Sequence, residues 1–450
     1  MKEKTDILIL GAGPAGMISA LTALKYYPDK QITVLKSVAK GVVPCGIPYM
    51  FSSLTDPEDN ELDTTGLEKK RVRVHIDEAV TLERAKKTVL TLSGKEYSYE
   101  KLIVAVGSKP IVPPIPGIDK EGIYPILKDM EYLKQMVEKV RSGGNVLVIG
   151  GGFIGVEFAD EVSKIPSCKV RLVEILPRLL SRSFDPEFSC EVEEKLRSRG
   201  VEVLTGRKVT AFLGDKKVTG ARFENGEEFA ADRVILGIGA VPNTELASLG
   251  GIELRKATGG IWVDEYMRTS DSDIFAVGDC AGKRDFYTHK DTSVMLASTA
   301  TAEARIAGAN LYSLKVVREN KGTIAVYSTY VDGLVLGSAG LTGYSADKEG
   351  FETITGSAEG MDKHPGKLPG SGKLKVKLIF SKQSGTLMGG QVSGGISAGE
   401  MINIIGMAIQ QRVSVSELET LQMATHPFLT AAPTKYGIVV AAQDALSKMR

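Results

Sequence analysis

The chain has 450 residues, which fits two to four domains at the usual ~100–200 residues each. Its 56 Lys and Arg residues nearly cancel its 55 Asp and Glu residues, and this balance argues against nucleic acid or an anionic membrane as a partner and favours small ligands. No apolar run approaches the ~18 residues of a membrane span, and the apolar segment in "MKEKTDILIL" is too short for a signal peptide. We therefore expect a cytoplasmic protein.

A glycine-rich turn follows the first apolar run. Residues 6–10, "DILIL", have the character of a buried strand, "GAGPAG" comes next, and "MISALTALKYY" predicts a helix. Gly11, Gly13 and Gly16 have the G-x-G-x-x-G spacing, in which the first glycine makes the turn, the second admits a pyrophosphate, and the third allows close helix packing. Such turns also arise for packing alone, so a single copy leaves both interpretations open.

The same strand, glycine turn and helix occur a second time. In "NVLVIGGGFIGVEFADEV" a strand at 145–149 precedes Gly150, Gly152 and Gly155. The next strand, "KVRLVE", ends at Glu174, which is 174 − 150 = 24 residues after the first glycine and near the ~20 expected of a carboxylate that binds a ribose. The first unit has Lys36 at the matching place, and a lysine cannot accept ribose hydrogen bonds, although it can reach a phosphate or an adenine edge. We call each glycine turn with its following helix a cradle, because it can hold a pyrophosphate. Two such cradles predict that two dinucleotides bind.

Three later motifs complete a pattern. "YEKLIVAVGSKP", "ADRVILGIGAVPN" and "SDIFAVGDCA" follow in the order found in the FAD-dependent pyridine nucleotide–disulfide oxidoreductase superfamily, which this sequence resembles over nearly its whole length. Val106 departs from the family, which usually has Thr there, and Lys36 is the other departure. The resemblance implies an α/β fold with two Rossmann-like dinucleotide-binding domains and a C-terminal α+β dimerisation domain.

The resemblance also implies where the domains lie. The FAD-binding domain is split between residues 1–112 and 246–320, the NAD(P)H-binding domain occupies 113–245, and the dimerisation domain occupies 321–450. In the last part, alternating apolar strands and helices near 398–412 and 433–448 are expected. We therefore expect a homodimer, although the same apolar pattern would also suit a plain domain core.

Cofactor contacts are implied by the resemblance as well. Asp279 is expected to accept from the ribityl chain, with a simple turn role as the alternative, and the helix starting near Leu296 and Ala297 is expected to aim its N-terminus at the flavin. Glu157 is expected near flavin and nicotinamide, or otherwise as a solvated helix charge. The full predicted set comprises Gly11, Gly13, Pro14, Ala15, Gly16, Lys36, Val80, Ala105, Val106, Gly107, Gly150, Gly152, Phe153, Ile154, Gly155, Glu157, Glu174, Gly239, Gly278, Asp279, Leu296 and Ala297.

Glu174 also bears on which nicotinamide cofactor is used. A carboxylate repels a 2′-phosphate, so Glu174 favours NADH, while the nearby Arg178 leaves NADPH as an alternative.

The four cysteines are far apart, without the spacing of a zinc site or a disulfide scaffold. Cys45 lies in "GVVPCGIPYMF", and Met50 stands where two-cysteine members of the superfamily have their second cysteine. This pattern resembles the single-cysteine branch, which includes NADH oxidases, NADH peroxidases and coenzyme A-disulfide reductases. The resemblance implies a Cys45 thiolate of lowered pKa that alternates with a sulfenic acid or a mixed disulfide; an inert buried cysteine is the alternative. Cys168, Cys190 and Cys280 are expected to be structural.

Proton donors are harder to assign. His426, in "ATHPFLTAAPTKY", resembles the His-Pro segment that two-cysteine members send across the dimer interface, but Ala431 stands where the orienting carboxylate belongs. His426 is therefore either a proton donor or a packing residue, and Tyr436 and Tyr49 are alternative phenol donors. No histidine lies in "GAGPAG", which argues against peroxide as the dedicated substrate.

These features together predict a flavin oxidoreductase. Electrons pass from NAD(P)H through FAD to Cys45 and on to a small disulfide, persulfide or polysulfide, with coenzyme A as one candidate thiol. One alternative is an NADH oxidase that reduces oxygen. Another is a redox-responsive electron carrier or binding protein.

Overall fold

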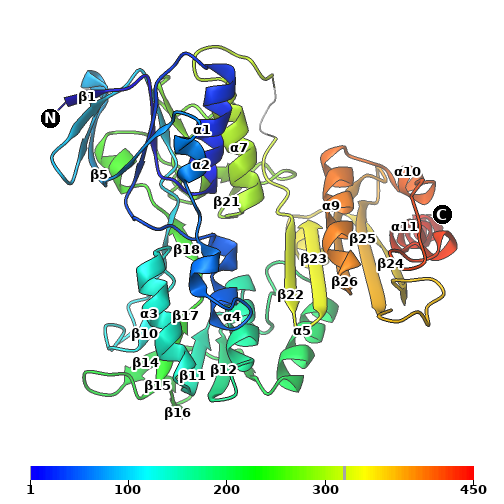
Figure 1. Ribbon diagram of the computed structural model, residues 1–450. Coiled ribbons are helices and arrows are strands. Elements are labelled where there is room, and N and C mark those ends of the chain that lie inside the picture. Colours follow the sequence, from blue (N-terminus) through cyan, green and yellow to red (C-terminus); the bar gives the residue numbers. More distant parts are fainter. Residues whose placement is uncertain (1, 318–320, 450) are drawn as a thin grey trace.

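The computed structural model describes residues 2–317 and 321–449 as three bodies (Figure 1). Two bodies are built on parallel sheets and the third on an antiparallel sheet, so the predicted α/β class is confirmed. Residues 318–320 lie outside the described residues, and with them the end of the predicted FAD-binding domain at residue 320.

The first body centres on a five-stranded sheet in which every pairing is parallel. Its strands, in spatial order, are β19 (Ile274–Ala276), β8 (Lys101–Val104), β2 (Ile7–Leu10), β3 (Ile32–Lys36) and β4 (Arg73–Ile76). Strand β2 is wholly buried, as its unbroken apolar sequence predicts for a strand covered on both faces. Helices α1 (Pro14–Tyr26) and α7 (Ala297–Ala309) lie side by side in this body (Figure 1).

Smaller elements surround this sheet. They are β1 (Lys2–Lys4), β7 (Glu96–Ser98), β6 (Thr88–Thr91) and β5 (Ala79–Glu83) in one sheet, the pair β9 (Ser108–Pro110) and β18 (Ala240–Pro242), the pair β20 (Lys283–Arg284) and β21 (Asp291–Thr292), and the short helices α2 (Thr65–Glu68) and α6 (Glu245–Leu249).

The second body repeats the parallel plan. Its sheet runs β10 (Ile123–Pro125), β17 (Arg233–Leu236), β11 (Gly144–Ile149), β12 (Cys168–Glu174) and β13 (Glu202–Thr205). Helices α3 (Met130–Arg141), α4 (Phe153–Ser163) and α5 (Pro186–Ser198) belong to it, with an antiparallel sheet of β14 (Val209–Leu213), β15 (Gly220–Phe223) and β16 (Glu228–Ala230). In both bodies the strand before the glycine turn has neighbours on both sides, which is the position where ligands bind in such sheets.

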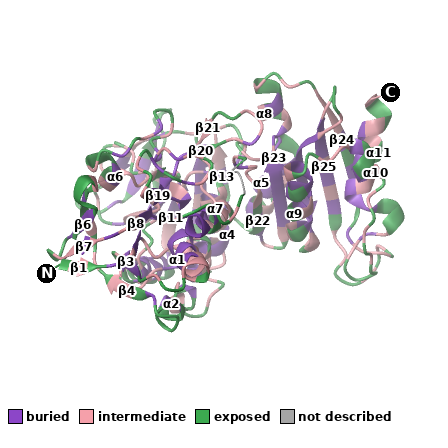
Figure 2. Cartoon of the chain, turned by 90° about the horizontal axis from the view of Figure 1, so that it is seen from above, coloured by how far each residue is buried: buried purple, intermediate pink, exposed green. Residues whose placement is uncertain are grey.

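The third body is the antiparallel sheet with its helices. The strands are β22 (Tyr327–Val331), β23 (Leu334–Gly340), β26 (Leu387–Gly394), β25 (Lys373–Ser381) and β24 (Thr353–Met361), and the helices are α8 (Gly343–Lys348), α9 (Ser397–Gln410), α10 (Val415–Glu419) and α11 (Gly437–Met449). Figure 2 shows the buried faces of this body gathered between sheet and helices, and α9 and α11 share one core with β25. Helix α11 starts four residues later than predicted because Pro433–Lys435 form a separate 3-10 turn.

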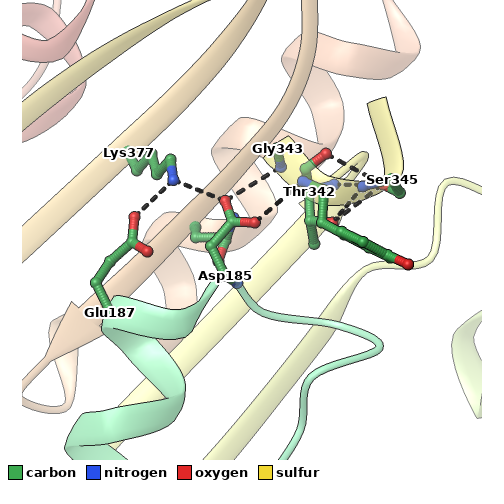
Figure 3. Close-up of polar contacts among 8 residues, drawn as sticks. Asp185, Glu187, Thr342, Gly343, Ser345 and Lys377 are labelled. Atoms are coloured by element: carbon green, nitrogen blue, oxygen red, sulfur yellow. Dashed lines mark hydrogen bonds and ion pairs between the residues drawn. The ribbon is translucent and has the colours of Figure 1, made fainter. Parts of the chain in front are cut away.

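A buried polar junction joins the second body to the third. Asp185 lies just before α5, and its Oδ2 accepts from Lys377 Nζ at 2.8 Å and from Gln391 Nε2 at 2.7 Å, while Gln391 Oε1 accepts from the Asp185 N–H at 2.7 Å. The N–H of Gly343 donates to the same carboxylate at 3.1 Å (Figure 3). Burial pushes the pKa of Asp185 upward, but the hydrogen bonds from Lys377 and Gln391 outweigh burial and hold the net pKa below its usual range. One carboxylate, that of Asp185, thus contacts three segments of the third body, around Gly343, Lys377 and Gln391.

No helix in the described ranges 2–317 and 321–449 is long and apolar enough to span a membrane.

Candidate functional site

The two glycine turns have the same geometry. Gly11 and Gly150 have φ values of 103° and 105°, in the left-handed region that favours glycine. A Cβ on Gly16 would lie 1.9 Å from the Gly11 carbonyl oxygen, and a Cβ on Gly155 would lie 1.7 Å from the Gly150 oxygen. The first and third glycines of each turn are thus required by the backbone itself.

The second glycines face open space. A Cβ on Gly13 or Gly152 would meet no atom of the described chain within 4 Å, although both residues have ordinary extended backbone. These glycines are the N-caps of α1 and α4, and no side chain caps either helix, so the first backbone N–H groups face the same space. Both turns therefore fit a bound pyrophosphate.

The strands next to the cradles end in the residues that were predicted. Lys36 ends β3, and its Nζ donates to Thr64 Oγ1 at 3.2 Å. Glu174 ends β12 and is buried; its carboxylate accepts from the N–H of Gly151 at 2.5 Å and from that of Leu176 at 2.7 Å. Glu174 thus holds the second glycine turn in place, and its contact with a ribose stays a prediction. Arg178 is ion-paired with Glu193 at 3.1 Å.

Asp279 lies in a 3-10 turn, Gly278–Cys280, directly after β19. Its Oδ2 accepts from Ser108 Oγ at 2.8 Å and lies 3.3 Å from Lys128 Nζ. A Cβ on Gly278 would lie 2.9 Å from the Ala15 Cβ, so this turn packs directly against the first cradle. Sequence reasoning missed Ser108 and Lys128; Ser108 follows Gly107 within a motif already singled out, whereas nothing in the sequence marks Lys128.

A buried ion pair supports the Asp279 turn. Lys283 Nζ and Glu303 Oε2 are 2.9 Å apart, and their side chains are 5% and 3% exposed. The same Glu303 oxygen accepts from the Gly278 N–H at 2.9 Å, and Lys283 donates to the Gly278 carbonyl at 2.6 Å. This pair ties the turn to α7 and was not predicted. Cys280 beside it is fully buried, and burial raises the pKa of its thiol to about 11, which suits a structural cysteine.

The remaining predicted contacts are placed as follows, and their roles in cofactor binding stay predictions. Asn243 links two motifs, because its N–H donates to the Gly107 carbonyl at 3.0 Å and its side chain to the Val106 carbonyl at 3.5 Å. Phe153, at the start of α4, stacks on Tyr327 of β22 with ring centroids 4.8 Å apart. Leu296 is the N-cap of α7, with no side-chain cap, as the flavin prediction requires. The set is completed by Pro14, Ala15 and Ala105 beside the first turn, Ile154 in α4, Gly239 at φ 98°, Ala297 at the start of α7, and Val80, 38% exposed on β5.

Cys45 occupies a short 3-10 turn, Pro44–Gly46, and is exposed. The Asn60 side chain donates to the Val43 carbonyl at 3.1 Å, and a Cβ on Gly46 would lie 1.9 Å from Asn60 Oδ1, so Gly46 is required there. Met50 is fully buried in the core beneath. The alternative of a buried, inert cysteine therefore does not fit Cys45.

The charges around Cys45 correct one expectation. Packing around the thiol raises the pKa of Cys45, the carboxylates of Glu157 and Asp279 raise it further, and Lys128 opposes them. The predicted lowering of this pKa is thus wrong for the chain by itself, because two carboxylates and partial desolvation outweigh one lysine.

Glu157 is not a solvated helix charge. It lies on α4, and its Oε1 accepts from Thr329 Oγ1 of β22 at 2.8 Å. Burial raises the pKa of Glu157 to about 7, with Glu161 and Asp160 adding to the effect. Burial and the Glu157 carboxylate also raise the pKa of Tyr49, so the phenol stays protonated and can donate a hydrogen bond.

Helix α4 also holds the segment that follows the cysteine turn. The fully buried Glu161 accepts from the Ser53 N–H at 2.8 Å and from its Oγ at 2.7 Å. Lys164 pairs with Glu161 at 2.5 Å and with Asp160 at 2.9 Å. The cysteine turn, α4 and β22 thus form one connected unit.

His426 and Tyr436 lie elsewhere. His426 is exposed, and its ring nitrogen accepts from the Phe428 N–H at 3.3 Å. Tyr436 is only 6% exposed and belongs to the core of the third body. Figure 1 shows α11, which follows Tyr436, at the far end of the third body from α4. Either side chain would therefore have to reach Cys45 from a second chain, and the proton-donor roles of His426 and Tyr436 stay predictions.

Comparison with known proteins settles the family. The model of the family described as pyridine nucleotide-disulphide oxidoreductase matches residues 5–304, and that of the family's dimerisation domain matches residues 326–436. The chain belongs to the pyridine nucleotide-disulphide oxidoreductase family. It is therefore an NAD(P)H oxidoreductase that uses FAD, and it carries the family's dimerisation domain.

Relatives in this family fall into two groups. The chain is 30% identical over 454 residues to an NADH oxidase of Methanocaldococcus jannaschii, covering 98% of this chain and 99% of the relative. It is 29% identical over 401 residues to an NAD(P)H coenzyme A polysulfide/persulfide reductase of Pyrococcus horikoshii, covering 88% of each. Among solved structures, an NAD-dependent persulfide reductase from A. fulgidus matches at 29% identity with a TM-score of 0.91, covering 100% of this chain and 83% of that one.

Proposed function

We propose that this enzyme uses NAD(P)H to reduce a small disulfide, persulfide or polysulfide through Cys45. One observation carries the proposal: Cys45 is exposed on a fixed turn, and the position of a second cysteine is taken by the fully buried Met50. The sulfur that pairs with Cys45 must then come from outside the chain. Coenzyme A is one candidate carrier of that sulfur, since the relative in Pyrococcus horikoshii is named for it.

The proposed chemistry is thiol–disulfide exchange. The Cys45 thiolate attacks one sulfur of a disulfide, a new S–S bond forms on Cys45, and the departing thiolate takes up a proton. FAD, when bound, supplies the electron pair from NAD(P)H that cleaves this mixed disulfide, releasing the second thiol and restoring Cys45. The chain must therefore favour the Cys45 thiolate and handle one proton in each half of the cycle.

Three groups suit these tasks. Lys128 favours the thiolate by its charge, and it also pairs with Asp279 at 3.3 Å. Glu157, with a pKa of about 7, exchanges protons readily near neutral pH. Tyr49 supplies a protonated phenol, because burial and the carboxylates of Glu157, Glu161 and Asp160 raise its pKa.

The cofactors would occupy the two cradles. We assign FAD to the first, where Gly13, α7 and Asp279 converge, and the nicotinamide cofactor to the second, beside Gly152 and Glu174. NADH is the favoured donor, because a 2′-phosphate would have to displace Glu193 from Arg178 next to the buried Glu174 carboxylate.

We further propose a homodimer in the cytoplasm. The matched dimerisation domain and the exposed 427–429 segment beside His426 support a second copy that brings His426 toward Cys45. All four cysteines are free thiols, as suits a reducing compartment.

The proposal is tested by two anaerobic measurements. Consumption of NADH and NADPH is followed with coenzyme A disulfide, polysulfide or no acceptor, and the intact mass of the protein is recorded after incubation with the best acceptor. We expect acceptor-dependent consumption and one thiol adduct, mapped to Cys45. Consumption without any adduct on Cys45 would remove the thiol mechanism.

NADH oxidase activity is the second candidate. It is favoured by the relative in Methanocaldococcus jannaschii that carries that name and covers 98% of this chain. Oxygen uptake that persists in Cys45→Ser would support simple oxidase chemistry. The third alternative, a carrier without turnover, does not fit membership in an enzyme family.

A further inference from the structure

One cavity is lined by no residue of either glycine turn. Its volume is about 340 Å³, and its lining residues come from the first body and from the third. Arg284 of β20 is one of the lining residues from the first body, and Figure 2 shows where β20 lies. The lining residues are Arg255, Val263, Asp264, Glu265, Gly282, Arg284, His289, Lys321, Gly322 and Arg412.

The wall of this cavity contains a buried arginine. The Arg255 side chain is 8% exposed, and its Nη1 pairs with Asp291 Oδ1 at 2.9 Å. Its Nη2 donates to the Val263 carbonyl at 3.3 Å, while its Nε, also buried, has no hydrogen-bond partner among the described residues. The Nε atom lies against Gly282, where a Cβ would be only 2.6 Å from it, so Arg255 contributes positive charge to the cavity wall rather than a free Nε donor.

The rim adds three more cations. Arg284, Lys321 and Arg412 are exposed, and none of them forms a side-chain ion pair within residues 2–317 and 321–449. Arg412 has its guanidinium over the Phe286 ring, 5.6 Å from the centroid, which limits where the charge can point.

The acidic residues do not neutralise this cluster. Asp264 is held by Arg268, whose Nη2 lies 2.6 Å from Asp264 Oδ2, and Glu265 is the other lining carboxylate. Four cations against two carboxylates leave local positive charge in a chain whose overall net charge is only +1.

We propose that this cavity binds a small ligand that carries phosphate groups with two or more negative charges. Guanidinium groups match phosphate oxygens in two-point hydrogen bonds, and the volume lies within the range of small-molecule sites. Because Arg255 and Arg284 belong to the first body and Arg412 to the third, the ligand bridges the two.

The test uses the FAD-loaded enzyme in saturating NAD⁺, so that both glycine cradles are filled, and titrates pyrophosphate in a calorimeter. We expect one site per chain, weakened by added salt and preferring pyrophosphate to citrate. The double variant Arg284→Gln, Arg412→Gln should bind pyrophosphate on the order of tenfold more weakly, or weaker still. The matched control is the double variant Lys208→Gln, Lys216→Gln, which removes two exposed cations of the second body. It should bind pyrophosphate with the affinity of the wild type.

Arg255→Gln is avoided because it would leave Asp291 without its partner and threaten folding. Three results would each overturn the site: no binding at millimolar pyrophosphate, equal affinity in the arginine variant and wild type, or tighter binding of citrate. The rate of NADH consumption is measured on the same samples. A sample that consumes NADH but does not bind pyrophosphate would disprove this site without bearing on the proposed reaction.

Discussion

Glu157 and Thr329 join the second body to the third beside the cysteine turn, by a hydrogen bond of 2.8 Å from the Thr329 hydroxyl to the Glu157 carboxylate. The Glu157 side chain is half-buried, partial burial raises its pKa to about 7, and its carboxylate raises the pKa of the Cys45 thiol in turn. The protonation of Glu157 and the reactivity of Cys45 are therefore coupled.

The substitution Glu157→Gln tests this coupling. Removing the carboxylate removes a group that raises the pKa of Cys45, so alkylation of Cys45 by iodoacetamide should reach its half-maximal rate at lower pH than in wild type. Glu131→Gln, at an exposed site on α3, serves as the control and should leave the profile unchanged. An unchanged profile in Glu157→Gln would contradict the coupling.

Lys128→Met should act in the opposite direction. Lys128 is the cation that lowers the pKa of Cys45, so its loss should shift the alkylation profile to higher pH. The matched substitution Lys109→Met removes an exposed lysine that pairs with Glu245 and should have no effect. A shift to lower pH in Lys128→Met would show that the charges around the thiol are wrongly assigned.

The second and third glycines of each cradle should respond differently to alanine. In Gly152→Ala the new methyl group would meet no atom of the described chain, and the backbone angles suit alanine, so the variant should fold normally. It should bind NADH roughly tenfold more weakly or worse, because the methyl group enters the space for the pyrophosphate. Gly155→Ala places a methyl 1.7 Å from the Gly150 oxygen and should lower the free energy of unfolding by at least ~1–3 kcal/mol.

Binding of NADH is measured by fluorescence titration and stability by urea unfolding. Normal NADH binding in Gly152→Ala would show that the cradle is not the cofactor site. The pair Gly13→Ala and Gly16→Ala makes the same comparison for FAD.

The Asp185 junction should make the free energy of unfolding depend on pH in the acid range. The folded-state pKa of Asp185 is below the ordinary value of 3.8, so its contribution is present above pH ~3.8 and is lost as the pH falls through the lower folded-state value. Asp185→Ala should cost roughly 3 kcal/mol in free energy of unfolding at pH 7, and the difference from wild type should shrink below pH 4. Glu187→Ala, which removes a more exposed partner of Lys377, should cost less than about 1 kcal/mol. Equal losses in both variants would contradict the role of Asp185.

The parallel bodies and the cradles were predictable because an apolar run precedes each turn and each turn has glycines at fixed spacing. The structure confirms β2 and β11 before the two turns, with Lys36 and Glu174 at the ends of the next strands. These features depend on short segments and are therefore readable from sequence.

The environment of Cys45 was not predictable in the same way. Lys128, Glu157 and Asp279 are far apart in the chain, and their effects on the Cys45 pKa depend on how the first and second bodies pack. The Lys283–Glu303 pair is likewise formed by distant segments and leaves no local pattern. A tyrosine in a core and a tyrosine at a site look alike in sequence; Tyr436 is buried in the third body of its own chain, and its role as a proton donor stays a prediction.

The most direct test of the account is the anaerobic rate of NADH consumption with a small disulfide acceptor, compared between wild type and Cys45→Ser with FAD bound in both. Cys190→Ser, a substitution of a half-buried cysteine on α5, serves as the control. The account predicts that disulfide-dependent consumption falls to the enzyme-free level in Cys45→Ser and is unchanged in Cys190→Ser. A wild-type rate in Cys45→Ser would contradict it.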